Sequence, residues 1–292
     1  MRILWCLIIK YHLQGMLSKN TIEKWIIPNL SIGSRGFECK VPLVELVEAI
    51  LYRLKTGCQW RELPTEKFFS ETILSWNSVY YHFNKWGKAG CWRKIFVNLL
   101  RENRQYLDLS RLSLDGSHTP SKNGGEAVAY QGRKSCKTTN TLFIVDNQGI
   151  ALSMSTPQDG NHHDLYEINI LFNELCDMLK DAGISLDGLF LNADSGFDSK
   201  ELKEVCSKEG IIANIKPNPR NKQDNKVIEI TDKIFDDELY KGRYVIERTN
   251  AWVDGFKALL IRFEFSVQNW ISLHLMAFAV ILLHKVAKKT KV

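Results

Sequence analysis

The residue pattern changes near residue 111, and this change limits the chain to two differently built parts. Before it, apolar residues recur at helical spacing, in one run that follows Pro42 and in a second over residues 73–86. After it, short apolar runs typical of strands alternate with amphipathic runs typical of helices. Strands that alternate with helices build a sheet covered by helices. The sequence therefore predicts a helical part followed by an α/β part.

The α/β part contains one clear hairpin signal. Residues 141–146 and 150–155 are apolar runs, and the turn-forming residues Asn147, Gln148 and Gly149 lie between them. The other elements follow from periodicity and from the residues that break it. We predict helices over residues 166–182 and 199–209, strands over residues 112–114, 189–191 and 211–215, and a long helix over residues 236–263.

The helical part is predicted to contain three helices between residues 42 and 103. The middle helix carries an aromatic stripe and is followed by Gly87, a residue that commonly ends a helix. Helix, break and helix is typical of a helix-turn-helix-like DNA reader. A small helical bundle whose aromatic residues only form the core fits the periodicity equally well. In the first case the polar face of the middle helix would contact DNA through Asn77, Tyr81 and Lys85.

The positive charge is concentrated in the helical part. The chain has a formal net charge of +6. Residues 1–110 contain 16 Lys and Arg against 9 Asp and Glu, whereas residues 111–292 contain 23 against 24. A basic, aromatic-rich domain beside a nearly neutral one is typical of a polyanion-binding module joined to a second activity. Many basic surfaces bind nothing, so charge alone leaves nucleic-acid binding as one option.

Cysteine usage and hydropathy favour a soluble, cytoplasmic protein. The seven cysteines form no CxxC pair, which is typical of free thiols in a reducing compartment. Residues 3–9 are too few to span a membrane, and residues 270–283 are also fewer than a bilayer requires. We expect no membrane association, and we interpret residues 270–283 as a buried core helix.

Three carboxylates in the α/β part suit metal-dependent chemistry. Asp115 and Asp194 each follow a short apolar run that predicts a strand, and Glu247 lies on the predicted long helix. Carboxylate oxygens are the ligands that Mg²⁺ prefers, and two ions about 4 Å apart can activate a nucleophile against a phosphodiester. An aspartate after a strand is also a common turn residue, and Glu247 alone would be an ordinary exposed charge.

The segments around these acids resemble the insertion-sequence transposases of the DDE class. Residues 114–118, 192–198 and 243–249 carry the resemblance, and they are most similar to the insertion-sequence-five group. The similarity covers residues 17–285 in the family's order. Further motifs of the group match residues 56–64, 75–76, 79–81, 124–127 and 132–134.

This resemblance implies a ribonuclease-H-like mixed sheet flanked by helices, an α/β fold preceded by a small all-α domain. It implies that Asp115 and Asp194 lie on neighbouring strands and Glu247 on a helix. It further implies that Asp115, Asp194 and Glu247 hold two Mg²⁺ or Mn²⁺ ions. It also implies nicking at the terminal inverted repeats of the element and transfer of the freed 3′-hydroxyl ends into target DNA. We expect a homodimer on double-stranded DNA.

The expected domain division follows from the same resemblance. We expect a helical DNA-binding domain over residues 17–107 and a catalytic domain over residues 108–287. Residues 288–292 would be a basic tail. Residues 1–16 would be a non-native or disordered extension, because Met16 is a second candidate for the true start.

One position departs from the family's Tyr-x2-Arg-x3-Glu-x6-Lys signature. Tyr240, Arg243 and Glu247 have the expected spacing, but Asp254 stands where a basic residue is expected. Lys257, one turn further along the predicted helix, is the candidate replacement. The departure affects the basic contact with DNA and leaves the three carboxylates intact.

Other charged groups are weaker candidates. Arg243 and Arg248 flank Glu247 and would hold a phosphate, or they would form a salt-bridged helix face. The segment 162–164, His-His-Asp, looks like a metal triplet, but adjacent histidines point in different directions and we expect no zinc site. Trp252 is expected to pack in the core. A basic cluster expected either to touch the DNA backbone or to remain solvated comprises Arg133, Lys134 and Lys137.

Two alternative functions stay open at this point. A catalytically silent or domesticated transposase-derived regulator would still bind DNA, and Asp254 favours that reading slightly while the intact carboxylates oppose it. A metal-dependent hydrolase of small phosphoesters would use the same carboxylates but would leave the basic helical part without a purpose.

Overall fold

The computed structural model describes residues 16–31, 39, 41–219 and 235–290, and the chain packs into two compact units. The helical unit combines Met1–Leu99 with Val253–Val292, and the α/β unit is Leu100–Trp252. The sequence analysis expected one domain over residues 108–287. The packing assigns residues from 253 onward to the helical unit, because helix α11 (Val267–Lys289) packs against α3 (Leu43–Thr56) and α4 (Trp76–Lys88). The predicted extension over residues 1–16 lies almost wholly outside the described residues.

Serine side chains cap the starts of two helices of the helical unit, and a glycine ends a third. The Ser18 hydroxyl accepts from the Thr21 backbone N–H at the start of α2, and the Ser75 hydroxyl does the same for Ser78 at the start of α4. Gly57 ends α3 in the left-handed conformation that glycine adopts without strain. The remaining elements of this unit are α2 (Lys19–Trp25), η1 (Ile27–Asn29), η2 (Trp60–Glu62), η3 (Thr65–Lys67), the first part of α5 (Cys91–Glu102) and α10 (Lys257–Leu260).

The aromatic stripe of the helical part forms its core. Phe83 and Trp86 on α4 are buried and pack near Trp92 of α5. A buried ion pair joins the two segments of the unit, since Arg53 of α3 lies 2.7 Å from Glu264. The Trp60 indole N–H also donates to Glu264, at 3.1 Å. The bundle interpretation therefore explains the apolar face of α4, and DNA contact through its polar face remains a prediction.

Two helix boundaries differ from the sequence prediction. Gly87 lies inside α4, which continues to Lys88. A Cβ atom at Gly87 would stand 2.9 Å from the Ser272 hydroxyl of α11, so glycine serves here to bring two helices close together. Ile73 was placed on the buried face, but it precedes the helix and is 60% exposed.

Helix α11 is longer than predicted. It has 23 residues and a mean hydropathy of 1.7 over its apolar window, so length and composition alone would allow it to cross a membrane. The expectation that this segment is too short was therefore wrong. Of that window, 67% is buried, as in the core helix of a folded unit, and Phe278 packs against Phe96 of α5.

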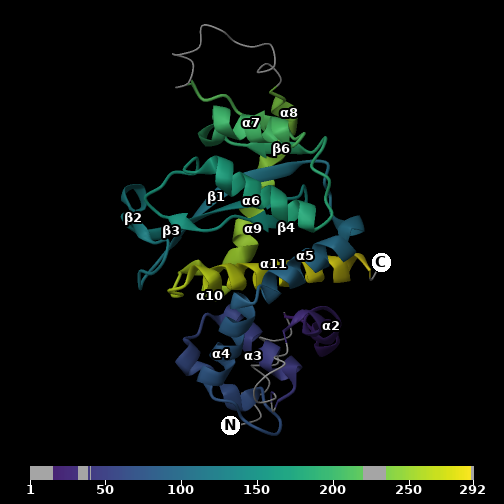
Figure 1. Cartoon of the computed structure of the whole chain (residues 1–292), viewed down its shortest axis with the longest axis vertical. Coiled ribbons are helices and arrows are strands. Elements are labelled where there is room, and N and C mark those ends of the chain that lie inside the picture. Colours follow the sequence, from purple (N-terminus) through teal and green to yellow (C-terminus); the bar gives the residue numbers. More distant parts are fainter. Residues whose placement is uncertain (1–15, 32–38, 40, 220–234, 291–292) are drawn as a thin grey trace. The chain divides into compact units, whose positions relative to one another are not determined.

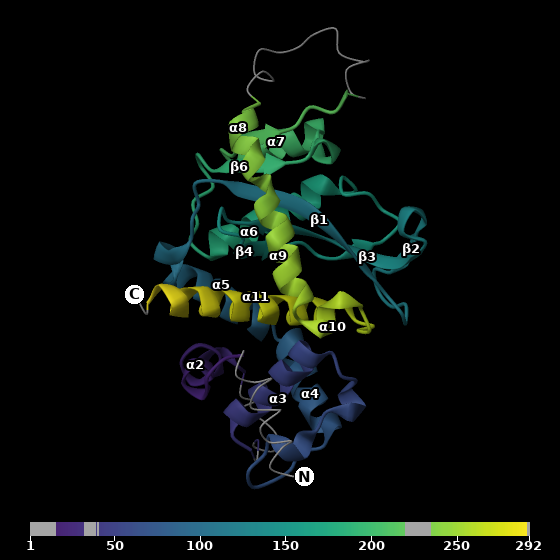
Figure 2. The ribbon, with the colours of Figure 1, turned by 180° about the vertical axis from the view of Figure 1, so that it is seen from behind.

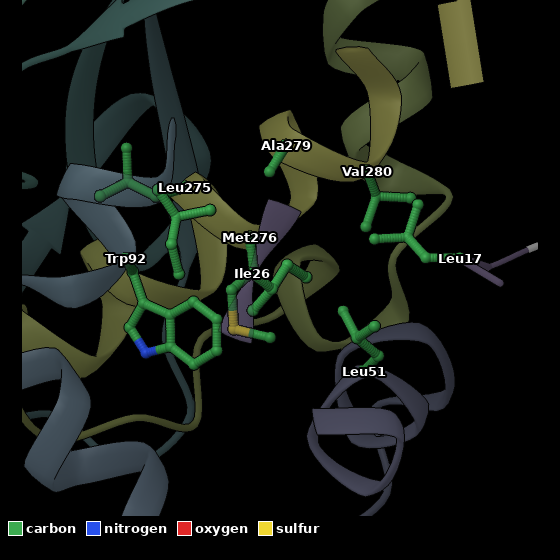
Figure 3. A pocket seen from close by; sticks show the side chains of 9 residues that line it. Leu17, Ile26, Leu51, Trp92, Leu275, Met276, Ala279 and Val280 are labelled. Atoms are coloured by element: carbon green, nitrogen blue, oxygen red, sulfur yellow. The ribbon is translucent and has the colours of Figure 1, made fainter. Parts of the chain in front are cut away.

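The centre of the helical unit is closely packed. Figure 3 shows side chains from the start of the chain, α3, α5 and α11 converging on one small apolar gap. The gap has a volume of about 10 Å³, which is about the size of a single water molecule and too small for a ligand. It is lined by Leu17, Ile26, Leu51, Trp92, Ile95, Leu275, Met276, Ala279 and Val280.

The α/β unit is built on a mixed sheet of order β2-β3-β1-β6-β7, in which β4 and β5 pair with β3. Strand β1 is antiparallel to β3 and parallel to β6, and β6 is parallel to β7. The strands are β1 (Leu112–Pro120), β2 (Ala129–Gln131), β3 (Cys136–Val145), β4 (Ala151–Met154), β5 (Gln158–Asp159), β6 (Phe190–Ala193) and β7 (Ile212–Ile215).

Helices cover both faces of this sheet. Figures 1 and 2 show α6 and α7 on one face and α9 crossing the other. Antiparallel strands followed by parallel strands, with helices on both faces, are the predicted ribonuclease-H-like arrangement, and this prediction is confirmed. The helical elements are η4 (Arg104–Tyr106), η5 (Gly132–Lys134), α6 (Ile168–Asp181), η6 (Ser195–Phe197), α7 (Lys200–Lys208), α8 (Asp237–Tyr240), η9 (Lys241–Tyr244) and the first part of α9 (Val245–Asp254).

The β3–β4 hairpin is confirmed, but two other elements differ from the prediction. Strand β1 continues to Pro120, because β3 remains paired with it as far as Thr138, so Asp115 lies within the strand and not after it. The long helix expected over residues 236–263 is a continuous helical run of α8, η9 and α9 as far as Asp254, and a break separates this run from α10. The Arg111 guanidinium lies where a Cβ of Gly242 would be, and Phe256 is extended, which separates α9 from α10.

Candidate active site

Two of the three predicted catalytic acids lie side by side on neighbouring parallel strands. In the register of β1 and β6, Leu112 is opposite Leu191 and Ser113 is opposite Asn192. Continuing this register by two residues places Asp115 level with Asp194, which directly follows β6. Because side chains alternate between the two faces of a strand, both acids point to the same face of the sheet. Both are half-buried.

The pKa of Asp115 reflects the charges around it. The pKa of Asp115 is raised to about 6, mainly by burial and in smaller part by the negative charges of Asp194 and Asp164. The Gly116 N–H, which donates to Asp115 at 2.9 Å, and the nearby Arg243 act in the opposite direction on this pKa. A carboxylate held among other carboxylates is stabilised by a cation, and oxygen-only donors suit a hard divalent ion.

Asp164 is the acid that the sequence analysis did not place at this site. Its Oδ1 would stand 2.2 Å from a Cβ atom on Gly116, so its carboxylate lies directly against the backbone next to Asp115. Asn140 donates to the same oxygen at 2.8 Å, and His118 Nε2 lies 3.8 Å from it. The signal for Asp164 in the sequence was Gly116, directly after Asp115. A glycine has no side chain and so leaves room for another group to approach the backbone.

Glu247 is on the first turn of α9 and is exposed. Within residues 16–31, 39, 41–219 and 235–290, no three His, Cys, Asp or Glu side chains are placed to bind one metal ion. The structure thus brings Asp115 and Asp194 together, but it does not place Glu247 with them as a third ligand of one metal ion. The role of Glu247 stays a prediction.

The side chains of the segment 162–164, His-His-Asp, have separate partners. The His162 ring stacks on Tyr166, with centroids 3.5 Å apart. His163 Nδ1 accepts from the Leu165 backbone N–H at 3.1 Å, and Asp164 turns toward Gly116. The three side chains therefore have different partners, as expected for adjacent residues outside a regular ligand motif.

The arginines that flank Glu247 lie over aromatic rings. Arg243 is 5.8 Å from the centre of the Tyr240 ring, and Arg248 is 5.7 Å from that of Trp252. In the described part of the chain neither forms the helix-face salt bridge that was the alternative. The positive charge of Arg243 lowers the pKa of Asp115, against the effect of burial.

Next to this arginine, α8 and η9 form a basic and aromatic hollow of about 350 Å³. Lys216 lies 5.9 Å from the centre of the Tyr240 ring, and Tyr244 is 67% exposed. Cations that hold a backbone and rings on which bases stack are what single-stranded nucleic acid requires. Lys216, Lys241 and Tyr244 were not among the residues predicted from the sequence, although Tyr240 and Arg243 pointed to this region. The hollow is lined by Lys216, Asp237, Tyr240, Lys241, Arg243 and Tyr244.

The remaining predicted DNA contacts are spread over both units. Around η5, Arg133, Lys134 and Lys137 are exposed, and the Lys134 ammonium donates to the His118 carbonyl at 2.9 Å. In the helical unit, the backbone of Lys257 packs against Gly57 while its side chain is exposed. Exposed or half-buried polar residues of α4 are Asn77, Tyr81 and Lys85.

The fold and the paired aspartates define a DDE-type nucleic-acid-processing domain. The chain belongs to the DDE transposase family, because residues 107–282 match the family model described as the transposase DDE domain. Residues 21–96 match a second model, for transposases of the IS4/5 family. The resemblance stated from the sequence is confirmed.

Individual relatives are more distant. An uncharacterized 16.2 kDa protein of insertion element IS402 from Burkholderia cepacia is 32% identical over 81 residues, 27% of this chain and 52% of the relative. The chain thus spans about half the length of the curated relative that it matches. A piggyBac transposase synaptic complex with hairpin DNA is 9% identical, with a TM-score of 0.49, over 96% of this chain and 76% of that one. A Mos1 paired-end complex is 11% identical, with a TM-score of 0.28, over 92% and 86%.

Proposed function

We propose that this protein is a DNA transposase that nicks the terminal inverted repeats of its element and transfers the freed 3′-hydroxyl ends into target DNA. The observation that carries the proposal is the level placement of Asp115 and Asp194 on neighbouring parallel strands, in a chain of the DDE transposase family. We further propose that it works in the cytoplasm, at the nucleoid, as a homodimer on two DNA ends.

Asp115, Asp194 and Glu247 would hold the divalent metal, two ions of Mg²⁺ or Mn²⁺. The donor set fits, because it offers only carboxylate oxygens and because the charge repulsion on Asp115 is relieved by a cation. When bound, such ions activate the attacking oxygen and stabilise the leaving one. The chain itself would orient the DNA, with Arg243 contributing a positive charge next to the scissile phosphate.

DNA beyond the cleaved bond would be held by the cations of the α/β unit. The hollow of α8 and η9 supplies Lys216 and Lys241, with Tyr244 as an exposed ring for a base. Phosphate contacts contribute most of the affinity and make it salt-dependent. The wider set of proposed DNA contacts is Arg133, Lys134, Lys137, Arg248 and Lys257, and Asn77, Tyr81 and Lys85 on α4.

A transposase-derived regulator without catalysis is the second candidate, and one observation favours it. Asp254 is exposed at the end of α9, where the family signature has a basic residue. An acid at that position repels DNA phosphate. Such a protein would bind DNA and leave it intact.

The test is a nicking assay on labelled duplex DNA that carries the element's own terminal repeats, with Mg²⁺ or Mn²⁺. Wild type is compared with Asp115→Asn, Asp194→Asn and Glu247→Gln, each checked for an unchanged unfolding transition. We expect metal-dependent cleavage at the repeat boundary that all three changes abolish.

The outcomes separate the two candidates. Cleavage that survives loss of any of the three acids would remove that residue from the site. Sequence-specific binding by a folded wild type without cleavage would favour the regulator, and Asp254→Lys would then be the first change to restore cleavage.

A further inference from the structure

Two buried asparagines lie on the sheet face that carries the paired aspartates. Asn192 of β6 is 0% exposed and Asn214 of β7 is 1% exposed, and the strand register places them opposite each other. Asn192 precedes Asp194 by two residues, so the two side chains share a face. Their neighbours along these strands are apolar, as expected for parallel strands buried by helices.

These two amides hold helix α8 through a continuous set of hydrogen bonds. Asn214 donates to the Asn192 side-chain oxygen at 2.8 Å and to the Asp236 carbonyl at 3.0 Å. It also accepts from the Asp236 N–H at 2.8 Å, so Asp236 is bound at two points. Asn192 donates to the Leu239 carbonyl at 3.0 Å. Both ends of the four-residue helix are thereby attached to the sheet.

Further hydrogen bonds hold α8 in place. The Asp236 carboxylate accepts from the Leu239 N–H at 2.9 Å, which caps α8. Arg111 donates to the Leu239 carbonyl at 3.3 Å and is itself held by Asn147, at 2.9 Å. The Leu239 carbonyl therefore accepts from two elements of the α/β unit, and Tyr240 is the next residue.

An apolar residue would fill either position without the cost of burying an amide. A buried polar group is tolerated when it is hydrogen-bonded, and its bonds then select one arrangement of the parts that it joins. Apolar packing alone would let a helix of only four residues slide or rotate on the sheet. The amides fix which residue of α8 meets which strand.

The position of α8 matters because it leads directly into groups of the candidate active site. Tyr240 supports the Arg243 guanidinium, and Arg243 acts electrostatically on Asp115. Glu247 lies one turn beyond Arg243, at the start of α9. A shift of α8 along the sheet would move all of these groups relative to Asp115 and Asp194, which are fixed in their strands.

We propose that Asn192 and Asn214 are positioning residues for the reaction: they set the place of Tyr240, Arg243 and Glu247 relative to the paired aspartates. This inference rests on the proposed function, because the reaction that it serves is DNA cleavage. In this proposal both asparagines act through α8, and not through contact with the DNA or with a metal ion.

The experiment uses the full chain with Asn192→Leu, a change that roughly keeps side-chain size but removes both the bond to Leu239 and the oxygen that accepts from Asn214. Ser153→Ala, at a buried β4 position remote in sequence from α8, is the control. Three quantities are measured: amide hydrogen exchange over residues 237–244, the single-turnover nicking rate against Mn²⁺ concentration, and the affinity for repeat DNA. If Asn192→Leu does not fold, Asn192→Ser, which is too short to reach Leu239, replaces it.

We expect exchange over residues 237–244 to rise at least about tenfold, because two buried hydrogen bonds are lost. We expect a nicking rate at least about tenfold lower and a higher half-saturating Mn²⁺ concentration, with DNA affinity within about twofold of wild type. Ser153→Ala should change none of these. A merely structural asparagine would lower stability without moving the Mn²⁺ dependence.

Two results would overturn the proposal: an Asn192→Leu variant that nicks like wild type, or a Ser153→Ala control that is impaired to the same degree. Failure of the proposed function is recognised separately, because wild type would then nick no DNA under any metal. In that case the exchange over residues 237–244 alone decides whether the asparagines fix α8.

Discussion

At the scale of single residues, Gly116 shows how little space surrounds the paired aspartates. A Cβ at this position would stand 2.2 Å from the Asp164 carboxylate, well inside contact distance. Gly116→Ala should therefore displace Asp164, destabilise the fold by about 1–3 kcal/mol and lower the nicking rate. Gly132→Ala is a matched control, since nothing lies within 4 Å of its Cβ position. Urea unfolding and nicking are measured for both, and equal behaviour of the two variants would refute the contact.

The raised pKa of Asp115 predicts a pH-dependent stability. Its folded-state pKa of about 6 exceeds its usual 3.8, so the folded protein binds this proton more tightly than the unfolded chain. The contribution of Asp115 to the free energy of unfolding is therefore largest below pH 3.8, and it is lost as the pH rises through about 6. Without metal, Asp115→Asn should be more stable than wild type at pH 8 by up to about 3 kcal/mol.

The measurement is urea unfolding of wild type and Asp115→Asn between pH 4 and pH 8 in the presence of a chelator. The advantage of the variant should shrink toward pH 4, and Mg²⁺ should reduce it at pH 8 by stabilising the wild type. If the difference in unfolding free energy between the two proteins does not change with pH, the pKa of Asp115 is not raised in the folded protein.

At the scale of elements, the contact of α3 with α10 depends on a glycine. Gly57 has a positive φ of 66° and its Cβ position lies 2.8 Å from the Lys257 backbone. Gly90 has nearly the same φ, 69°, with nothing within 4 Å. Both alanine variants carry the backbone strain of about 1–2 kcal/mol, but only Gly57→Ala also forces the elements apart. Thermal unfolding should show Gly57→Ala to be the less stable of the two, and equal losses would contradict the close contact.

The hollow of α8 and η9 gives a second prediction at this scale. Lys216→Ala and Lys241→Ala each remove a cation that faces the hollow. Each should weaken repeat-DNA binding and lower the slope of log affinity against log salt by about 0.9, the value for one phosphate contact. Lys208→Ala, on exposed α7, serves as the control and should leave the slope unchanged. Binding is measured by fluorescence anisotropy at several salt concentrations.

The elements also show what sequence can predict. The β3–β4 hairpin and helix α3 are specified locally, by Asn147 to Gly149 in one case and by Pro42 and Gly57 in the other. The long predicted helix narrows to a 3-10 turn over η9, where the distant Arg111 lies against Gly242, and it is interrupted at the extended Phe256. Periodicity does not contain that information. The same reason explains why Gly87 was interpreted as a helix stop.

Only those residues of the candidate site that stand in a recognisable motif were predicted from the sequence. Motif resemblance placed Asp115 and Asp194 on neighbouring strands, and the strand register agrees. Asp164 was missed because its partners, Gly116 and Asn140, lie far from it in sequence. Asn192 stood inside a quoted motif, yet its bond to Leu239 depends on the placement of α8, which no local pattern specifies.

At the scale of the whole molecule, the helical unit is made from two separate stretches of chain. Helix α11 packs against α3 and α4, and the buried Arg53–Glu264 pair joins the same two stretches. An N-terminal fragment of residues 16–99 would leave Arg53 without its carboxylate and would expose the surfaces that α11 covers. Loss of one partner of a buried ion pair typically costs about 3–5 kcal/mol, a large part of the stability of a small unit.

We therefore predict that residues 16–99 alone do not fold, whereas residues 16–99 joined to residues 253–290 by a flexible Gly/Ser linker do. Residues 100–252, which hold the whole sheet and the paired aspartates, should unfold cooperatively by themselves. Circular dichroism and urea unfolding of the three proteins test this, with Glu264→Gln in the linked protein as the control for the ion pair. A cooperative transition in residues 16–99 alone would show that the C-terminal stretch is not part of that core. It would also favour the division at residue 107 that the sequence suggested.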